Sequence, residues 1–140
     1  MPIKKAEATW KGDLKSGKGS MKLESGSYEG NYSFATRFGD TAGTNPEELI
    51  GAAHAGCYSM AFSNELDKAG FTPNSVETHT EVTLDGSTAS ITTIKLITKG
   101  NVPNIDNAKF QEIAQAAKKG CPVSKALTGV DIKLDATLKN

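Results

Sequence analysis

The sequence predicts a mixed α and β protein that combines short antiparallel strands, one long buried helix and a hairpin. Residues 4–38 scatter aromatic and apolar side chains among Gly and Ser, a pattern typical of short strands joined by tight turns. Residues 46–69 place small or apolar side chains on nearly every face of a helix. Residues 76–98 alternate apolar and polar side chains around a turn. A chain of 140 residues suffices for one compact domain, so we expect a single domain over residues 1–140.

The N-terminal region is expected to form strands that turn at glycines. Tyr32, Phe34 and Thr36 fall on one face of a strand, which places Arg37 close to its end. The expected turns lie at Gly12, Gly17, Gly26 and Gly30.

The long helix has clear start and stop signals. Asn45 can cap it, Pro46 suits the first helical position, and Glu48 follows the cap by three residues. Gly70 is the expected left-handed residue after the helix, which therefore covers residues 46–69.

The middle of this helix carries two rows of small residues. One row holds Gly51, Ala55 and Ser59, and the other holds Ala53, Cys57 and Ala61, so a second helix could approach closely along either row. Because a single chain of this length has difficulty surrounding such a helix, we expect an intertwined homodimer.

The C-terminal half predicts a hairpin, two helices and a final strand. Asp85 and Gly86 supply the hairpin turn, and Cys121 directly follows the stop signal of the first helix, where it can cap the second. The expected ranges are 76–84 and 89–98 for the hairpin strands, 106–119 and 122–127 for the helices, and 130–138 for the strand.

Charge and composition exclude several classes of partner. Lys plus Arg and Asp plus Glu each number 16, so no net charge draws the chain to nucleic acid or to an anionic membrane surface. Residues 1–10 contain no apolar run typical of a signal peptide, and we expect a cytoplasmic protein.

The two cysteines are candidates for redox chemistry. Because the cytosol keeps thiols reduced, a bond between Cys57 and Cys121 would be transient and functional; the alternative is that both are small core residues. Cys57 lies in mid-helix, where burial raises a thiol pKa, whereas Cys121 at a helix start should have a lower pKa. The residues alone therefore favour Cys121 as the more reactive thiol.

Arg37 is the only arginine in the chain. A guanidinium can hold two oxygens at once and stays charged when partly buried, which suits a peroxide beside a thiolate. Glu47, at the start of the long helix, could hold it. The alternatives are a surface arginine at a strand end and a glutamate that only compensates the helix dipole.

The histidines give little support for a metal site. His54, Cys57, Cys121 and His79 lack the paired short spacings of zinc motifs. We expect His54 to form a local hydrogen bond on its helix and His79 to lie on the solvent face of a strand.

Several motifs together resemble the OsmC family, the osmotically inducible relatives of organic hydroperoxide resistance proteins. The strongest is the run from Asn45 to Cys57, NPEELIGAAHAGC. ATWKGD from Ala8 to Asp13, TRF from Thr36 to Phe38, AGFTP from Ala69 to Pro73 and GCPVS from Gly120 to Ser124 agree with it in order and spacing. The helix motif favours the OsmC branch over the hydroperoxide resistance branch.

This resemblance implies an α+β fold, with antiparallel sheets wrapped around long central helices in an intertwined homodimer. It implies a peroxidase of oxidative defence that reduces organic hydroperoxides, and hydrogen peroxide less efficiently. In this scheme Cys57 is the peroxidatic thiol, Cys121 resolves it, Arg37 activates the peroxide and Glu47 orients Arg37. The disulfide would be reduced by an external dithiol on a lipoyl-bearing protein, and no metal, haem or flavin is needed.

Two other functions remain open from the sequence. The dimer could bind a lipid-like ligand in an apolar cleft, with both cysteines serving only as core residues. Alternatively, the same disulfide could act as a redox sensor that passes its state to a partner.

Overall fold

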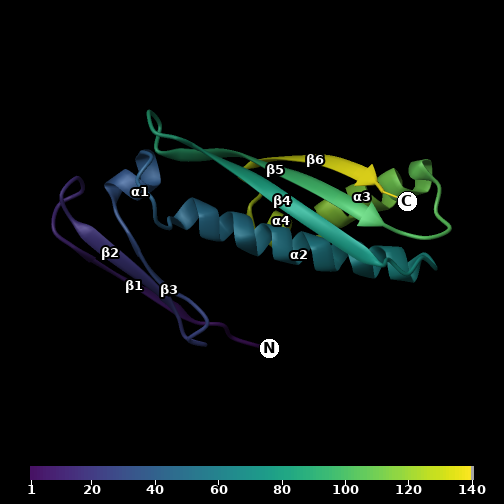
Figure 1. Ribbon diagram of the computed structural model, residues 1–140, viewed down its shortest axis with the longest axis horizontal. Coiled ribbons are helices and arrows are strands. Elements are labelled where there is room, and N and C mark those ends of the chain that lie inside the picture. The colour runs from purple at the N-terminus through teal and green to yellow at the C-terminus, as the bar shows by residue number, and fades with distance from the viewer. Residues whose placement is uncertain (140) are drawn as a thin grey trace. The chain divides into compact units, whose positions relative to one another are not determined.

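The computed structural model describes residues 1–139, which form two compact units divided between Leu49 and Ile50. Each unit has its own three-stranded sheet (Figure 1). The elements, in chain order, are β1 (Ala6–Lys11), β2 (Lys18–Leu23), β3 (Glu29–Tyr32), α1 (Phe34–Phe38), α2 (Pro46–Lys68), β4 (Ser75–Asp85), β5 (Ser90–Asn101), α3 (Asn107–Gly120), α4 (Pro122–Ala126) and β6 (Asp131–Leu138).

The first unit is an antiparallel sheet with the order β1-β2-β3. Gly12 and Gly26 lie in its turns with φ of 95° and 78°, as the sequence predicts. In β2, Gly19 lies beneath the rings of Trp10 and Tyr32, whose centroids are 5.5 Å apart. A side chain at this position would collide with both rings.

Gly30 does not form the predicted turn. It lies inside β3 and pairs with Met21 of β2. A Cβ atom at this position would overlap the hydroxyl of Tyr28, whose ring covers the glycine. Glycine is therefore needed here for close packing, and the turn lies earlier, around Gly26.

The prediction of a strand through Thr36 was wrong. The strand ends at Tyr32, and residues from Phe34 form the short helix α1. Ser33 and Thr36 form a capping box, in which each side chain accepts a hydrogen bond from the other residue's backbone N–H. This local capping outweighs the strand preference of the aromatic residues, and Arg37 lies in the last turn of α1.

The start and end of α2 agree with the prediction. Asn45 accepts a hydrogen bond from the Glu48 backbone N–H at 2.7 Å, and its amide donates to the Thr36 carbonyl oxygen at 3.0 Å. The helix ends at Lys68, and Gly70 follows with φ of 91°. One side chain thus caps α2 and ties it to the end of α1.

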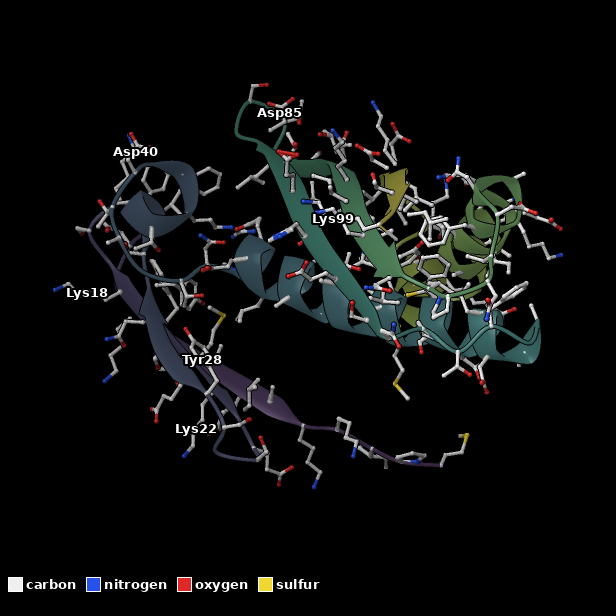
Figure 2. All side chains as sticks on the ribbon, turned by 45° about the vertical axis from the view of Figure 1, so that its right-hand side comes forward. Lys18, Lys22, Tyr28, Asp40, Asp85 and Lys99 are labelled. Atoms are coloured by element: carbon white, nitrogen blue, oxygen red, sulfur yellow. The ribbon has the colours of Figure 1, made fainter. Side chains whose placement is uncertain are left out.

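The second unit contains the sheet β4-β5-β6. β4 and β5 form the predicted hairpin, and Asp85 lies at its tip, where its carboxylate accepts from the Ser87 backbone N–H (Figure 2). β6 pairs with β5 in parallel, whereas the family resemblance implies antiparallel sheets. Helices α3 and α4 connect the two strands and return the chain to the end of the sheet at which β5 begins. β6 therefore runs in the same direction as β5.

Helices α2 and α3 cover one face of this sheet. Along β5, Ile94, Leu96 and Thr98 are buried, while Lys95 and Lys99, on the other face of the strand, are exposed. The buried apolar cluster of the protein lies in this second unit and includes Tyr58 and Phe62 of α2 and Phe110 and Ala114 of α3.

The first small-residue row of α2 packs on a strand and not on a helix. Gly51 lies against Thr80 and Val82 of β4, and the Ser59 hydroxyl donates to the Thr78 hydroxyl at 2.7 Å. The opposite face of α2 is exposed in the single chain, and Met60 there has a relative exposure of 79%. The other exposed residues of this face include Ala52, Ala53, Gly56 and Asn64.

We expect the substitution Gly51→Ala to destabilise the protein by about 1 kcal/mol, because the cost of overpacking exceeds the gain in helix propensity. A Cβ atom at Gly51 would lie 2.7 Å from Thr80 Oγ1. Chemical denaturation of Gly51→Ala in the native and in a Thr80→Ala background measures the effect. The penalty should shrink in the Thr80→Ala background; an equal penalty in both would contradict this contact.

Candidate active site

The structure brings the two cysteines together. Cys57 lies in the middle of α2, and Cys121 lies between α3 and α4 as the residue before Pro122. Their Sγ atoms are 3.0 Å apart, and both are free thiols. A disulfide bond is about 2.0 Å long, so only a small local movement is needed to join the two sulfurs.

The two thiols differ in their access to solvent. Cys121 is fully buried, with a relative exposure of 0%. Cys57 is half-buried and lines a cavity of about 580 Å³ that also contacts Met60 of α2, Ala117 of α3 and Pro122. A small molecule entering this cavity therefore meets the sulfur of Cys57.

The thiols also differ in acidity. Burial acts to raise the pKa of Cys121, but the contact with the Cys57 sulfur and the neighbouring residues Ser124 and Val123 at the start of α4 lower the net pKa. For Cys57, burial raises the pKa, and the neighbouring Cys121 sulfur raises it further. The pKa of Cys121 is thus lowered and that of Cys57 is raised, which is the order of acidity that the sequence predicts.

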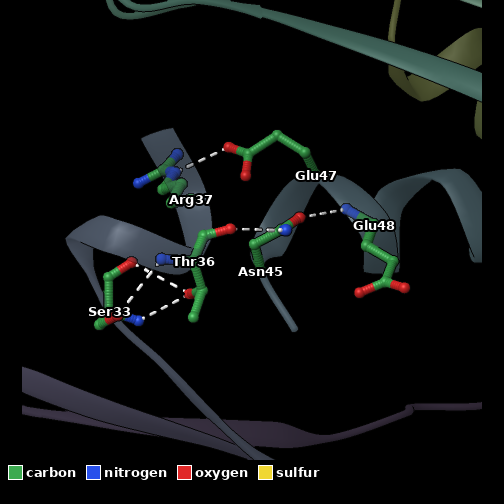
Figure 3. A network of polar contacts seen from close by, with 6 residues as sticks. All are labelled: Ser33, Thr36, Arg37, Asn45, Glu47 and Glu48. Carbon is green, nitrogen blue, oxygen red and sulfur yellow. Dashed lines mark hydrogen bonds and ion pairs between the residues drawn. The ribbon is translucent and has the colours of Figure 1, made fainter. Parts of the chain in front are cut away.

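Arg37 and Glu47 form an ion pair in the first unit (Figure 3). Arg37 Nε donates to Glu47 Oε1 at 2.7 Å, so the carboxylate approaches one edge of the guanidinium. Glu47 is buried, and its Oε2 atom has no hydrogen-bond partner within residues 1–139. This contact confirms the predicted pairing, and it leaves the terminal amino groups of Arg37 available for another ligand.

Apolar side chains line a cavity beside Arg37, whose side chain remains partly exposed. Arg37 lines a cavity of about 250 Å³ together with Trp10, Leu14, Phe34 and Phe38, among other residues. The Arg37 Cζ atom lies 5.5 Å from the centroid of the Phe38 ring. A single cation in an apolar pocket can hold a ligand that has one polar end and a hydrocarbon body.

The prediction of a local hydrogen bond for His54 was wrong. His54 is fully buried, and its Nε2 atom lies 2.8 Å from the hydroxyl oxygen of Ser124. Burial also lowers the pKa of His54. Ser124 was quoted in the family motif but received no role, because no sequence signal links α4 to a helix 70 positions earlier.

His79 is exposed on β4, as expected. Among residues 1–139, no three His, Cys, Asp or Glu side chains are placed to hold a metal ion together. No helix in the same range is both long and apolar enough to cross a bilayer.

The chain is similar to known proteins in both sequence and fold. Residues 39–135 match the family model of OsmC-like proteins. The chain is 51% identical over 140 residues to Peroxiredoxin OsmC of Escherichia coli (strain K12), a match that covers 98% of this chain and 97% of that protein. It is 34% identical over 95 residues to the organic hydroperoxide resistance protein OhrB of Bacillus subtilis (strain 168), covering 66% of this chain and 69% of OhrB.

A solved structure supports the fold independently of sequence. The crystal structure of an OsmC-like protein from Mycoplasma pneumoniae superposes with a TM-score of 0.75 at 14% identity, covering 99% of both chains. With the family model and the full-length similarity, this establishes that the chain belongs to the OsmC family and has its α+β fold.

Proposed function

We propose that this chain is a thiol peroxidase that reduces organic hydroperoxides, with Cys57 as the peroxidatic thiol and Cys121 as the resolving thiol. The observation that carries the proposal is a pair of free thiols 3.0 Å apart, one reachable and one buried. The 51% identity to a protein named peroxiredoxin and the 34% identity to a hydroperoxide resistance protein support the peroxidase activity.

Access favours Cys57 as the first thiol to react. Cys121 is the more acidic thiol, but its sulfur is fully buried and cannot meet a substrate. Cys57 lines the cavity of about 580 Å³, where its sulfur can meet a substrate. Since attack requires contact between sulfur and oxygen, exposure outweighs acidity in this choice.

In the first step the Cys57 thiolate attacks the distal oxygen of ROOH. An S–O bond forms, the O–O bond breaks, and the alkoxide takes a proton and leaves as the alcohol. The sulfur is oxidised to the sulfenic acid and the peroxide is reduced. Because burial raises the pKa of Cys57, this step needs a positive charge that stabilises both the thiolate and the departing oxygen.

We assign that charge to Arg37. Glu47 holds the guanidinium by one edge, so that its terminal amino groups can bind the peroxide oxygens. The apolar side chains around Arg37 favour a hydrocarbon group on the substrate. An organic hydroperoxide fits this environment better than hydrogen peroxide, which has no apolar body.

In the second step Cys121 attacks the sulfenic acid of Cys57. An S–S bond forms and hydroxide leaves, which a proton converts to water. An external dithiol then reduces the disulfide. The family resemblance supports a dihydrolipoyl group on a protein as this reductant.

We further propose that the protein acts as a homodimer. The exposed face of α2 around Met60 carries Ala52, Ala53 and Gly56 with one polar residue, Asn64, and exposed apolar side chains such as Leu14 and Trp10 occur in the first unit. Within residues 1–139 the buried apolar cluster lies in the second unit alone. A second copy of the chain would remove this apolar surface from water.

The cysteine assignments predict distinct outcomes for two variants. Cys121→Ser should consume about one equivalent of hydroperoxide in a single burst, because its sulfenic acid cannot be resolved, and Cys57→Ser should consume none. Peroxide assays with tert-butyl hydroperoxide and mass spectrometry of the thiols measure this. The reverse pattern would exchange the two roles, and oxidation without turnover on any dithiol would favour the redox sensor.

Arg37→Ala should slow the reaction of Cys57 with hydroperoxide by about 10²-fold or more, the loss typical of one donor at a developing oxyanion. Arg37→Lys should recover only part of this rate, since lysine keeps the charge but not the planar donor pair. Stopped-flow kinetics with Lys18→Ala as the exposed-cation control test the prediction. Near-native rates for Arg37→Ala would remove Arg37 from the mechanism.

A charge on the exposed face of α2 should disrupt the homodimer. We expect Met60→Lys to shift the protein from twice the chain mass toward the monomer, because the lysine would be buried between two apolar faces. Light scattering after size-exclusion chromatography measures this, and Thr88→Lys in the exposed hairpin turn adds the same charge as a control. A native protein of monomeric mass would contradict the proposal.

A further inference from the structure

One buried polar group is not used by the proposed mechanism. His54 has a relative exposure of 0%, and among residues 1–139 its Nδ1 atom has no hydrogen-bond partner. Its one polar contact is the 2.8 Å approach of Nε2 to the Ser124 hydroxyl. A buried histidine with a single partner is costly for the folded state, so the contact it retains merits a functional explanation.

The environment determines which nitrogen of His54 carries the proton. Burial lowers the pKa of His54, so the ring is neutral near pH 7 and has one N–H group. A proton on Nδ1 would leave a buried N–H unpaired, whereas a proton on Nε2 leaves only a lone pair there. The second arrangement costs less, and in it Nε2–H donates to the oxygen of Ser124.

This hydrogen bond from His54 restricts the orientation of the Ser124 hydroxyl group. With one lone pair occupied by His54, the hydroxyl proton is free to point elsewhere. Ser124 lies three residues after Cys121, in the first turn of α4, and the His54–Ser124 and Cys57–Cys121 contacts are neighbours, one turn apart on α2. The Ser124 side chain also lowers the pKa of Cys121. The hydroxyl proton can therefore point at the Cys121 sulfur.

We propose that His54 and Ser124 form a directed hydrogen-bond chain, from His54 Nε2–H to Ser124 Oγ–H to Cys121 Sγ, which holds the resolving thiol as a thiolate. His54 acts through Ser124 and is a positioning residue. The inference rests on the proposed function, because it assigns this hydrogen-bond chain to the resolving step. Its charge-stabilising effect on Cys121 can nevertheless be measured without any peroxide.

The hydrogen-bond chain acts in two steps of the proposed reaction, resolution and reduction. In resolution the Cys121 thiolate attacks the Cys57 sulfenic acid, the S–S bond forms, the S–O bond breaks, and hydroxide leaves and takes a proton from solvent. In reduction an external dithiol attacks the sulfur of Cys57, and Cys121 leaves as a thiolate. The Ser124 hydroxyl stabilises this leaving group, because a thiolate of lower pKa leaves faster.

Few other titratable groups face Cys121. Cys57 and Tyr58 lie on α2, and the Tyr58 hydroxyl donates to the Ala114 carbonyl oxygen at 3.0 Å and has a raised pKa. On the adjoining helices, Lys119 and Lys125 are exposed to solvent. The pKa of Cys121 is therefore lowered mainly by Cys57 and by the neighbouring residues of α4.

The first experiment isolates Cys121 in a Cys57→Ala protein and follows its thiolate absorbance against pH. We expect Ser124→Ala to raise the pKa of Cys121 the most, since it removes the hydroxyl, and His54→Leu to raise it less, since a free hydroxyl can still donate in part. His54→Gln should restore the native value, because its amide nitrogen occupies the place of Nε2. The double variant should match Ser124→Ala alone, as expected for groups acting in series.

The second experiment follows the two oxidation steps in the two-cysteine protein by stopped flow, with dimedone to capture the sulfenic acid. Near pH 7 we expect Ser124→Ala to slow resolution about three- to tenfold. Losing a hydrogen bond to a charged sulfur lowers the thiolate fraction about tenfold or more, and the greater nucleophilicity of a more basic thiolate offsets part of that loss. The deficit should vanish at high pH, where every variant is ionised.

The reaction of Cys57 with hydroperoxide should not slow in these variants, because a less charged Cys121 does not oppose the Cys57 thiolate. Ser59→Ala, which removes another α2 hydrogen bond at 2.7 Å to Thr78, is the matched control and should change neither step.

Two results would overturn the proposal. One is an unchanged Cys121 pKa in Ser124→Ala, and the other is an equal slowing of both oxidation steps, which indicates general damage to the fold. If the native protein does not react with hydroperoxide, the proposed function fails, while the titration still decides whether the chain of hydrogen bonds exists.

Discussion

The packing of α2 against α3 is the constraint on which the paired thiols depend. The Tyr58 hydroxyl donates to the Ala114 carbonyl oxygen at 3.0 Å, and the rings of Phe62 and Phe110 are 5.2 Å apart. These contacts fix the distance between the helices beside Cys57. Since α3 ends at Gly120, the next residue, Cys121, leaves the helix opposite Cys57. The sulfurs meet because two long helices are held in register by buried aromatic side chains.

This packing gives the two cysteine thiols different access to solvent and different pKa values. Cys57 keeps access to a cavity but lies in mid-helix, where burial and its neighbour raise its pKa. Cys121 is buried, but the contact with Cys57 and the residues at the start of α4 lower its pKa. Their positions therefore make Cys57 accessible to a small molecule and Cys121 the more acidic thiol. In the mechanism we propose, the lone arginine activates this half-buried, less acidic sulfur of Cys57.

Signals confined to a few neighbouring residues predicted much of the fold. Asn45 capped α2, Gly70 followed its end, and the hairpin turn at Asp85 formed as expected, because each depends on local hydrogen bonds or on backbone freedom. The sequence analysis failed where two local signals competed. At Ser33 a capping box prevailed over the strand preference of the neighbouring aromatic residues, and at Gly30 the ring of Tyr28 explained a glycine that had indicated a turn.

The sequence by itself indicated the family and the candidate residues, and it predicted a lower pKa for Cys121 than for Cys57, because Cys121 stands at the start of a helix. Only the tertiary structure decided which thiol is reachable and that His54 contacts Ser124. Both facts depend on side chains that meet across about 60 to 70 positions of chain. No local pattern encodes such contacts, because burial and long-range hydrogen bonds arise only when the helices pack.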